Sequence, residues 1–67
     1  MKTIGLEIKT RRKALGVNQK TLSELAGVGI NTLTKIERGE ANPTLEILEK
    51  VLETLGMELK VTVKSTF

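Results

Sequence analysis

The chain has 67 residues, enough for one small domain, and its 39% hydrophobic and 28% charged residues are typical of a globular protein. It contains no Cys, His, Tyr or Asp, which excludes disulfides and thiolate metal sites and leaves few general bases or nucleophiles. No apolar run could span a bilayer and no signal-peptide core follows Met1, so we expect a cytoplasmic protein away from membranes. Because the usual catalytic and metal-binding residue types are scarce, we also expect no cofactor, no metal and no enzymatic activity.

The formal net charge of +3 is unevenly distributed along the chain. Residues 1–38 hold eight basic and three acidic side chains, whereas residues 39–67 hold three basic and five acidic ones. The first part would therefore attract a polyanion such as nucleic acid. An ordinary solvated surface could carry the same charge, so this pattern alone leaves both interpretations open.

The first predicted element is a helix that Thr3 caps, that begins at Ile4 and that Gly16 ends. The apolar side chains on one face of this helix are Ile4, Ile8 and Leu15. Leu6 lies at the edge of this face and Arg12 lies close to it. We expect the face to contribute to the core.

Two shorter helices follow. Asn18 is a suitable N-cap for a helix over residues 19–26, and Gly27 favours the left-handed backbone that would end it. A third helix is predicted from about Ile30 to Glu37, with Gly39 after it. The apolar positions of the second helix are Leu22 and Leu25, and Leu33 and Ile36 face inward on the third. Two short helices joined by a tight glycine-containing turn form a helix-turn-helix arrangement.

A fourth helix and an extended tail complete the chain. Thr44, after Pro43, caps the helix, and Gly56 ends it. Its core positions are Leu45, Leu48, Leu52 and Leu55, and an additional apolar stripe is formed by Ile47 and Val51. The tail then alternates apolar and polar residues, as half-buried strands do. Its apolar positions, which we expect to form a dimer contact, are Met57, Leu59, Val61 and Val63.

The predicted tail strand has no partner within the chain. The same strand from a second copy could pair with it in antiparallel orientation about a two-fold axis. We therefore predict a domain over residues 1–56, a dimerisation tail over residues 57–67, and a homodimer.

The stretch from about Gly5 to Leu55 resembles the Cro and phage-repressor type of helix-turn-helix domain. The matching positions are Gly16, Asn18, Gln19, Leu22, Gly27, Val28, Leu33, residues 36–39 and residues 42–45. The resemblance implies an all-α, lambda-repressor-like fold of five or fewer short helices, here with a C-terminal β-strand pairing across a dimer. It also implies a transcriptional repressor that binds a palindromic site on double-stranded DNA.

In this family the second motif helix lies in the major groove of DNA, with its first residues at base edges. The DNA-binding candidates that the resemblance implies are Asn18, Gln19, Lys20, Ile30, Asn31, Thr32, Lys35, Arg38 and Asn42. Asn31 suits adenine, Lys35 suits guanine, and Ile30 or Thr32 could touch a thymine methyl group. Gln19 is implied to bond a phosphate and to buttress the second motif helix. Each residue has an alternative role as ordinary surface, and Ile30 could instead pack on the core.

The resemblance also implies a structural role for Arg12 and Glu37, which match a pair that often forms a buried salt bridge in this family. Three positions depart from the family pattern. Ser23 stands where Ala is usual, and Gly29 replaces the usual Ser or Thr cap. Ile30 occupies a position where a polar base-contacting residue is more common, which puts that individual contact in doubt.

The tail resembles that of the HipB-type antitoxins, short helix-turn-helix proteins that pair with a HipA-like kinase toxin. That likeness rests on the overall layout and on the LGMELKV ending. It implies an autoregulatory antitoxin with such a toxin as partner. Two alternatives remain: a free-standing phage-like repressor whose tail covers its own core, and a protein-interaction module.

Overall fold

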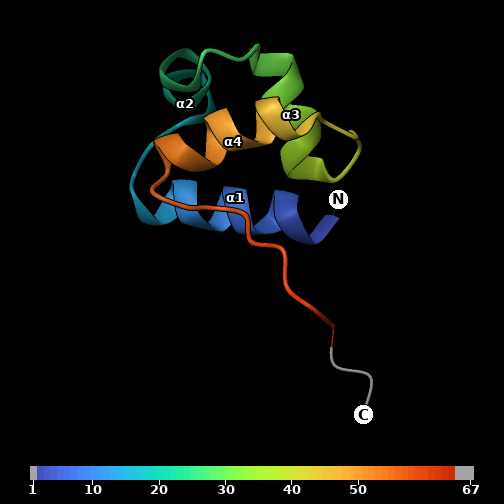
Figure 1. Cartoon of the computed structure of the whole chain (residues 1–67). Helices are drawn as coiled ribbons and strands as arrows, with labels where there is room; N and C mark the ends of the chain where they lie inside the picture. The colour runs from blue at the N-terminus through green and yellow to red at the C-terminus, as the bar shows by residue number, and fades with distance from the viewer. Residues whose placement is uncertain (1, 65–67) are drawn as a thin grey trace.

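Four helices lie within the part of the chain that the structure describes. The computed structural model describes residues 2–64 and contains α1 (Lys2–Ala14), α2 (Gln19–Ala26), α3 (Ile30–Arg38) and α4 (Leu45–Thr54). α1 packs against α3, and α2 packs against both α3 and α4 (Figure 1). No strand forms within residues 2–64, so the all-α part of the predicted fold is confirmed. None of these helices combines the length and apolar character needed to cross a membrane.

Short-range capping contacts set most helix ends. Asn18 Oδ1 accepts from the backbone N–H of Thr21 at 2.7 Å at the start of α2, and Gly27 ends that helix with a φ of 71°. Thr44 Oγ1 accepts from the backbone N–H of Ile47 at 3.2 Å and begins α4. These boundaries confirm the prediction from the sequence. At the start of α3, Gly29 provides extended backbone but no side-chain cap.

α1 differs from its prediction at both ends. It begins at Lys2 rather than at Ile4, so Thr3 lies inside the helix. A hydroxyl cap stabilises a helix end but does not stop the helix from extending, and neither Lys nor Thr breaks a helix. At the other end Leu15 lies beyond the helix and is 47% exposed, so its predicted core role is wrong. Arg12, one turn after Ile8, occupies the inward position instead.

All four helices contribute side chains to one hydrophobic core. Its buried residues are Ile8, Leu22, Ala26, Leu33, Ile36, Leu48, Val51, Leu52 and Leu55. Leu25, an apolar position of the second predicted helix, and Leu45, at helical spacing in the fourth, are 67% and 65% exposed because α2 and α4 turn other faces toward their neighbours. Val51, assigned to a surplus stripe, is fully buried, so α4 has less spare apolar surface than predicted.

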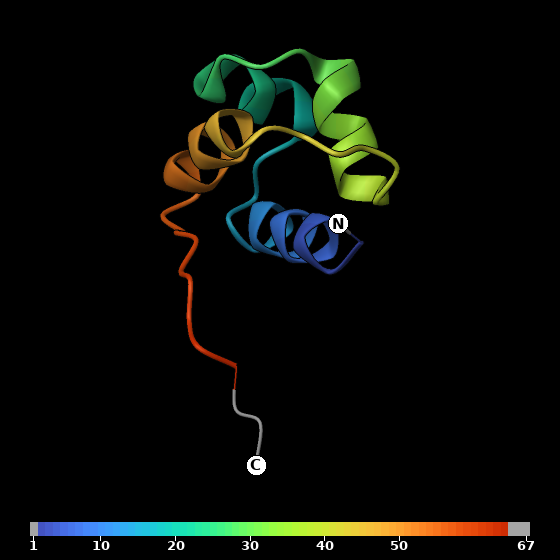
Figure 2. The same ribbon diagram turned by 45° about the vertical axis from the view of Figure 1, so that its right-hand side comes forward.

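The described part of the tail, residues 57–64, leaves the helical body after α4. Figures 1 and 2 both show these residues passing α1 and extending away from the helices. Met57 packs against the core, whereas Val61 and Val63 are fully exposed. Residues 57–64 form no strand within the single chain, and residues 65–67 of the predicted tail, like Met1, lie outside the described residues. Strand pairing across a dimer stays a prediction.

Candidate nucleic-acid interface

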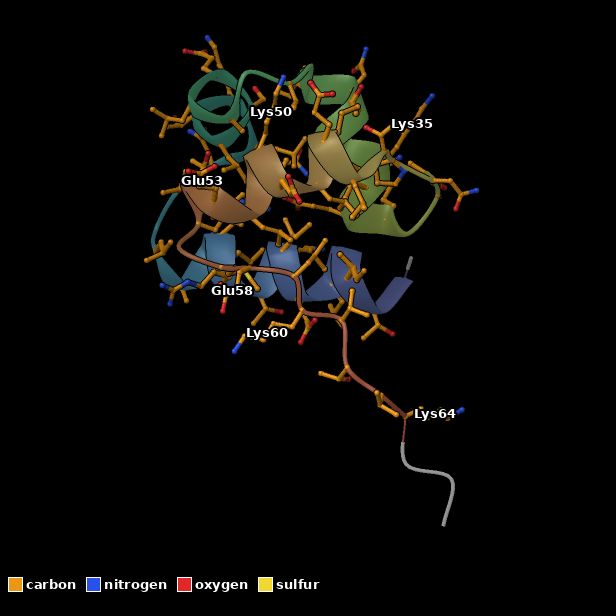
Figure 3. All side chains as sticks on the ribbon, viewed as in Figure 1. Lys35, Lys50, Glu53, Glu58, Lys60 and Lys64 are labelled. Atoms are coloured by element: carbon orange, nitrogen blue, oxygen red, sulfur yellow. The ribbon has the colours of Figure 1, made fainter. Side chains whose placement is uncertain are left out.

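The outer face of α3 presents the side chains that the sequence singled out. Asn31, Lys35 and Arg38 are exposed, Ile30 is 44% exposed, and Thr32 is half-buried. Asn31 and Lys35 are four residues apart, so they lie one above the other on the helix surface. Figure 3 shows Lys35 extending outward from α3. α3 thus offers amide, ammonium and apolar groups to solvent within two turns.

Further polar groups lie at the start of α2 and around the end of α3. The exposed candidates there are Asn18, Lys20, Arg38 and Asn42. The Oδ1 atom of Asn18 is occupied as the cap of α2, which leaves the amide N–H groups of this exposed side chain for an outside acceptor. Arg38 Nη1 lies 3.9 Å from Glu40 Oε1, and both side chains are well exposed. Such an exposed ion pair is weak, so it leaves the guanidinium able to bind another anion.

A buried ion pair joins α3 to α1. Arg12 Nε and Nη2 donate to Glu37 Oε2 and Oε1 at 2.7 and 2.9 Å, and the two side chains are only 9% and 2% exposed. Arg12 Nη1 also donates to the carbonyl oxygen of Val17 at 2.9 Å. These are the two residues that the family resemblance implied as a pair. The guanidinium holds α1, the turn after it and α3 in one arrangement, which fixes the direction of the outer face of α3.

Both members of this pair are held in their charged forms. Burial raises the pKa of Glu37, but hydrogen bonds from Arg12 and Gln19, with the positive charges of Arg12 and Lys9, outweigh burial and hold that pKa below its usual range. The hydrogen bond with Glu37 raises the pKa of Arg12, against the opposing effect of burial. The ion pair is therefore intact at neutral pH.

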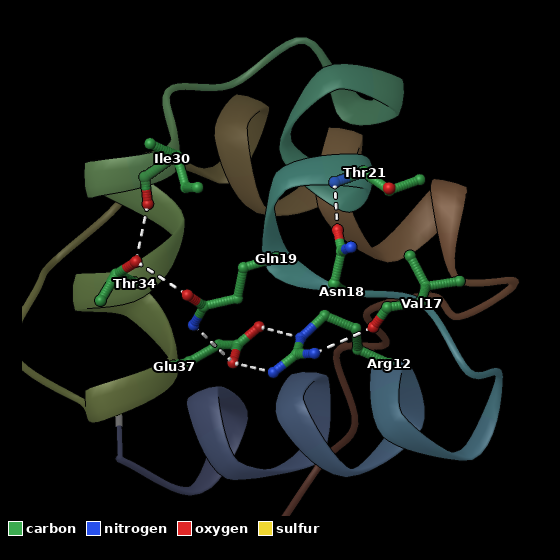
Figure 4. A network of polar contacts seen from close by, with 8 residues as sticks. All are labelled: Arg12, Val17, Asn18, Gln19, Thr21, Ile30, Thr34 and Glu37. Carbon is green, nitrogen blue, oxygen red and sulfur yellow. Dashed lines mark hydrogen bonds and ion pairs between the residues drawn. The ribbon is translucent and has the colours of Figure 1, made fainter.

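Gln19 links the ion pair to the middle of α3 (Figure 4). Its Nε2 donates to Glu37 Oε1 at 3.1 Å, and Thr34 Oγ1 lies 3.2 Å from its Oε1. The resemblance implied that Gln19 buttresses this helix, and its side chain does contact α3; its contact with a phosphate stays a prediction. Thr34 was not among the predicted site residues. Thr34 and Glu37 lie three apart on one face of α3, which could have indicated a shared partner.

Two other contacts that orient α3 and α4 were also missed. A Cβ atom at Gly5 would collide with the carbonyl oxygen of Ile36, so α1 and α3 approach too closely there for any side chain. Arg11 Nε donates to the carbonyl oxygen of Leu55 at 3.0 Å, at the end of α4.

Ser23 is buried, and its hydroxyl donates to a carbonyl oxygen of its own helix at 2.7 Å. The close helix packing at that position therefore tolerates Ser.

The groups around α3 suit hydrogen bonding to a polyanion. Their amide and ammonium N–H groups can donate to phosphate oxygens, and their amide oxygens can accept from bases. Within residues 2–64, no cluster of three or more Glu side chains, the only acidic type in this chain, is placed to hold a metal ion.

Comparisons with known proteins agree on the kind of domain. A family model described as helix-turn-helix matches residues 8–61. An uncharacterised helix-turn-helix-type transcriptional regulator of Haemophilus influenzae is 44% identical over 55 residues, which cover 82% of this chain and 56% of that protein. The immunity repressor protein of Bacillus phage phi105 is 38% identical over 61 residues, covering 91% of this chain and 42% of the repressor. The chain thus spans about half the length of these two relatives.

A third relative is closer in length. An uncharacterised helix-turn-helix-type transcriptional regulator of Methanothermobacter thermautotrophicus is 35% identical over 51 residues, which cover 76% of this chain and 74% of that protein. The matched regions of the three relatives are each long enough to hold the helix-turn-helix segment seen here, residues 19–38.

Proposed function

We propose that this chain, which belongs to the helix-turn-helix family of the Cro and phage-repressor type, is a sequence-specific DNA-binding transcriptional repressor. One observation carries the proposal most. The buried pair of Arg12 and Glu37 holds α3 so that Asn31 and Lys35 are exposed on its outer side. The phage immunity repressor among its relatives agrees with this function.

In the proposed complex α3 lies in the major groove of DNA. Asn31 makes a bidentate pair with an adenine, and Lys35 donates to the acceptor atoms of a guanine. Ile30 is exposed enough to contact a thymine methyl group; Thr32, which is half-buried, has less surface for this. These contacts would carry the base preference.

Phosphate contacts would orient the domain on the duplex. We assign them to residues at the start of α2 and around the end of α3: Asn18, Gln19, Lys20, Arg38 and Asn42. Gln19 keeps one N–H of its Nε2 group for a phosphate, because Glu37 accepts only the other. Such contacts add affinity without sequence information and make binding depend on salt.

Selection from a randomised duplex library tests the base contacts. Wild type should select a defined site, and Asn31→Ala should lose about 1–3 kcal/mol of discrimination at one base pair. Asn42→Ala is the matched control, because loss of a phosphate contact should weaken binding without changing the preferred site. If Asn31→Ala selects the wild-type site with the same stringency, Asn31 does not read a base.

Titration of a random duplex at two salt concentrations separates DNA binding from a protein-interaction function. A DNA-binding protein should lose affinity steeply as salt rises, because counterions are released when it neutralises phosphates. If no duplex binds at low salt, the interaction-module alternative is favoured instead.

We further propose a homodimer joined by the tail. Met57 packs against the core, and residues two apart share one face of an extended segment, so Leu59, Val61 and Val63 continue the same face beyond the helical body. A surface hollow of about 390 Å³ lies between Met57 and α1. The residues that line this hollow are Leu6, Glu7, Thr10, Arg11, Ala14 and Met57.

The same tail from a second copy fits these features as an antiparallel ribbon about a two-fold axis. The ribbon would cover the valines that a single chain leaves exposed. Val51 needs no such cover, because it is already buried within one chain. In such a dimer the two α3 helices would be about 34 Å apart, or one DNA turn, and the operator would be palindromic.

Sedimentation tests the tail dimer. The full chain should sediment as a dimer at tens of micromolar and a chain ending at residue 56 as a monomer. Full-length Val61→Lys should dissociate as well, whereas Thr62→Lys, on the opposite face of the ribbon, should not. A monomeric full chain, or a dimeric truncated one, would show that the ribbon does not form.

The antitoxin function rests on the likeness of the tail to those of HipB-type proteins, and its partner would be a HipA-like kinase toxin. The similarity to a phage immunity repressor instead favours a free-standing repressor. The neighbouring open reading frame distinguishes the two. A kinase-like gene whose product binds this chain supports the antitoxin function, and its absence supports the free-standing repressor.

A further inference from the structure

The hydroxyl group of Thr34 lies between two acceptors on different helices. It is 3.2 Å from Oε1 of Gln19, on α2, and 2.9 Å from the carbonyl oxygen of Ile30, on its own helix (Figure 4). A threonine has a single hydroxyl proton, so it can donate a full hydrogen bond to only one of them. Which acceptor receives the proton decides whether α2 and α3 are linked at this point.

Glu37 sets the direction of the Gln19 amide. A carboxylate only accepts hydrogen bonds, so Gln19 must turn its Nε2 toward Glu37, where the distance is 3.1 Å. Its Oε1 then faces Thr34 and needs a donor. The amide cannot rotate by half a turn without placing its oxygen against the buried carboxylate.

The Ile30 carbonyl oxygen needs the hydroxyl proton less than Gln19 does. In an α-helix this oxygen already accepts from the backbone N–H four residues later, which is that of Thr34 itself. Within residues 2–64, Thr34 is the one hydrogen-bond donor to Oε1 of Gln19. The hydroxyl proton is therefore better used in a hydrogen bond to Oε1 of Gln19 than in one to the Ile30 carbonyl oxygen. Through Gln19, Thr34 is connected to the pair of Arg12 and Glu37.

We propose that Thr34 is a positioning residue for base recognition. Its hydrogen bond to Gln19 fixes the position of α3 relative to the start of α2. This proposal rests on the proposed DNA-binding function. If Gln19 contacts a phosphate through its second N–H, the same amide fixes the distance from that phosphate to Asn31 and Lys35. Hydrogen bonds to base edges weaken steeply with misalignment, so losing the link lowers discrimination between sites more than it lowers total affinity.

Three Thr variants isolate the hydroxyl. Thr34→Val keeps the branched shape and removes the donor, and Thr34→Ser keeps the donor. Thr54→Val is the matched control, because the Thr54 hydroxyl donates to the carbonyl oxygen of Lys50 at 2.8 Å within α4 and, among residues 2–64, to no other helix. The measurements are the side-chain amide resonances of Gln19 without DNA, and the ratio of the dissociation constants for a random duplex and the selected site.

We expect Thr34→Val to shift the Gln19 amide resonances and to lower the affinity ratio about 3- to 10-fold, the range for one hydrogen bond. Thr34→Ser should restore both, and Thr54→Val should change neither. Gln19→Met removes the amide from the other side. In that background Thr34→Val should lower the ratio no further, because the link is already lost.

Several outcomes overturn the proposal. They are unchanged Gln19 resonances in Thr34→Val, an equal loss of affinity for both duplexes, or additive effects of the two substitutions. If Thr34→Val does not fold while Thr34→Ser does, Gln19→Met becomes the deciding variant. An unchanged affinity ratio in Gln19→Met would then show that the hydrogen bond between Thr34 and Gln19 has no role in site preference.

The same measurements separate this proposal from the proposed function. If wild type shows no preference for any site, the proposed function itself fails. If wild type prefers a site and Thr34→Val keeps that preference, only the role of Thr34 is rejected.

Discussion

Arg12→Met should be among the most destabilising single substitutions in this protein. It removes three hydrogen bonds, two to Glu37 at 2.7 and 2.9 Å and one to the Val17 carbonyl at 2.9 Å. The Glu37 carboxylate, 2% exposed, would keep only the donor from Gln19. Removing one partner of a buried ion pair lowers the free energy of unfolding by about 3–5 kcal/mol, because the other charge stays buried without its partner.

That cost is comparable with the whole stability expected for a domain of this size. At about 0.05–0.15 kcal/mol per residue, 67 residues give roughly 3–10 kcal/mol. Thermal unfolding followed by circular dichroism should show a Tm lower by about 12–40 °C, or no cooperative transition. Lys13→Met, at an exposed neighbouring position, is the control and should stay within about 0.5 kcal/mol of wild type.

A double variant, Arg12→Met with Glu37→Met, shows whether the unpaired charge is the cause. Removing both charges should recover part of the loss, because no buried carboxylate is left without its partner. Recovery should be incomplete, since Gln19 and Val17 still lose hydrogen-bond partners. A single variant that melts with wild type, or a double variant less stable than the single one, would refute this account.

Three further predictions concern stability and use the same unfolding measurement. Gly5→Ala should destabilise by about 2 kcal/mol or more, because its Cβ would collide with the Ile36 carbonyl oxygen; wild-type stability would show that α1 moves aside freely. Gly29→Ser should instead stabilise by a few tenths of a kcal/mol, since it adds the missing side-chain cap to α3, and a loss would contradict this. Folding lowers the pKa of Glu37, so its carboxylate contributes fully to the free energy of unfolding above its unfolded pKa of about 4.3. This contribution is lost as the pH falls through the lower pKa of the folded state. The stability difference between wild type and Glu37→Gln should therefore shrink below about pH 4; a difference independent of pH from 7 to 2 would contradict the shift.

The helix ends were the part of the fold that sequence analysis predicted best. Asn18 caps α2 and Thr44 caps α4 through hydrogen bonds to backbone groups three residues later. Such contacts form within a few residues of chain, so the residues that make them can be recognised without knowing what packs against the helix. The early start of α1 was missed because Thr3 can sit within a helix as well as cap one.

Burial was predicted less well because several apolar faces were possible for each helix. Leu22 and Leu25 are both at helical spacing in α2, yet only Leu22 is buried. Val51 belongs to the core of one chain, where the sequence suggested surplus apolar surface. The choice depends on the direction from which neighbouring helices approach, and that direction is a property of the whole domain.

The sequence by itself determined the four-helix pattern, the positions of the caps and the residues on the outer face of α3, because these follow from short-range contacts and helical periodicity. Only the tertiary structure showed that Gly5 permits α1 to touch α3 and that Thr34 shares Gln19 with the buried ion pair. Gly5 and Ile36 are 31 positions apart, and Gln19 and Thr34 are 15 apart. Contacts over such separations exist only once the helices have packed, so no local pattern could reveal them.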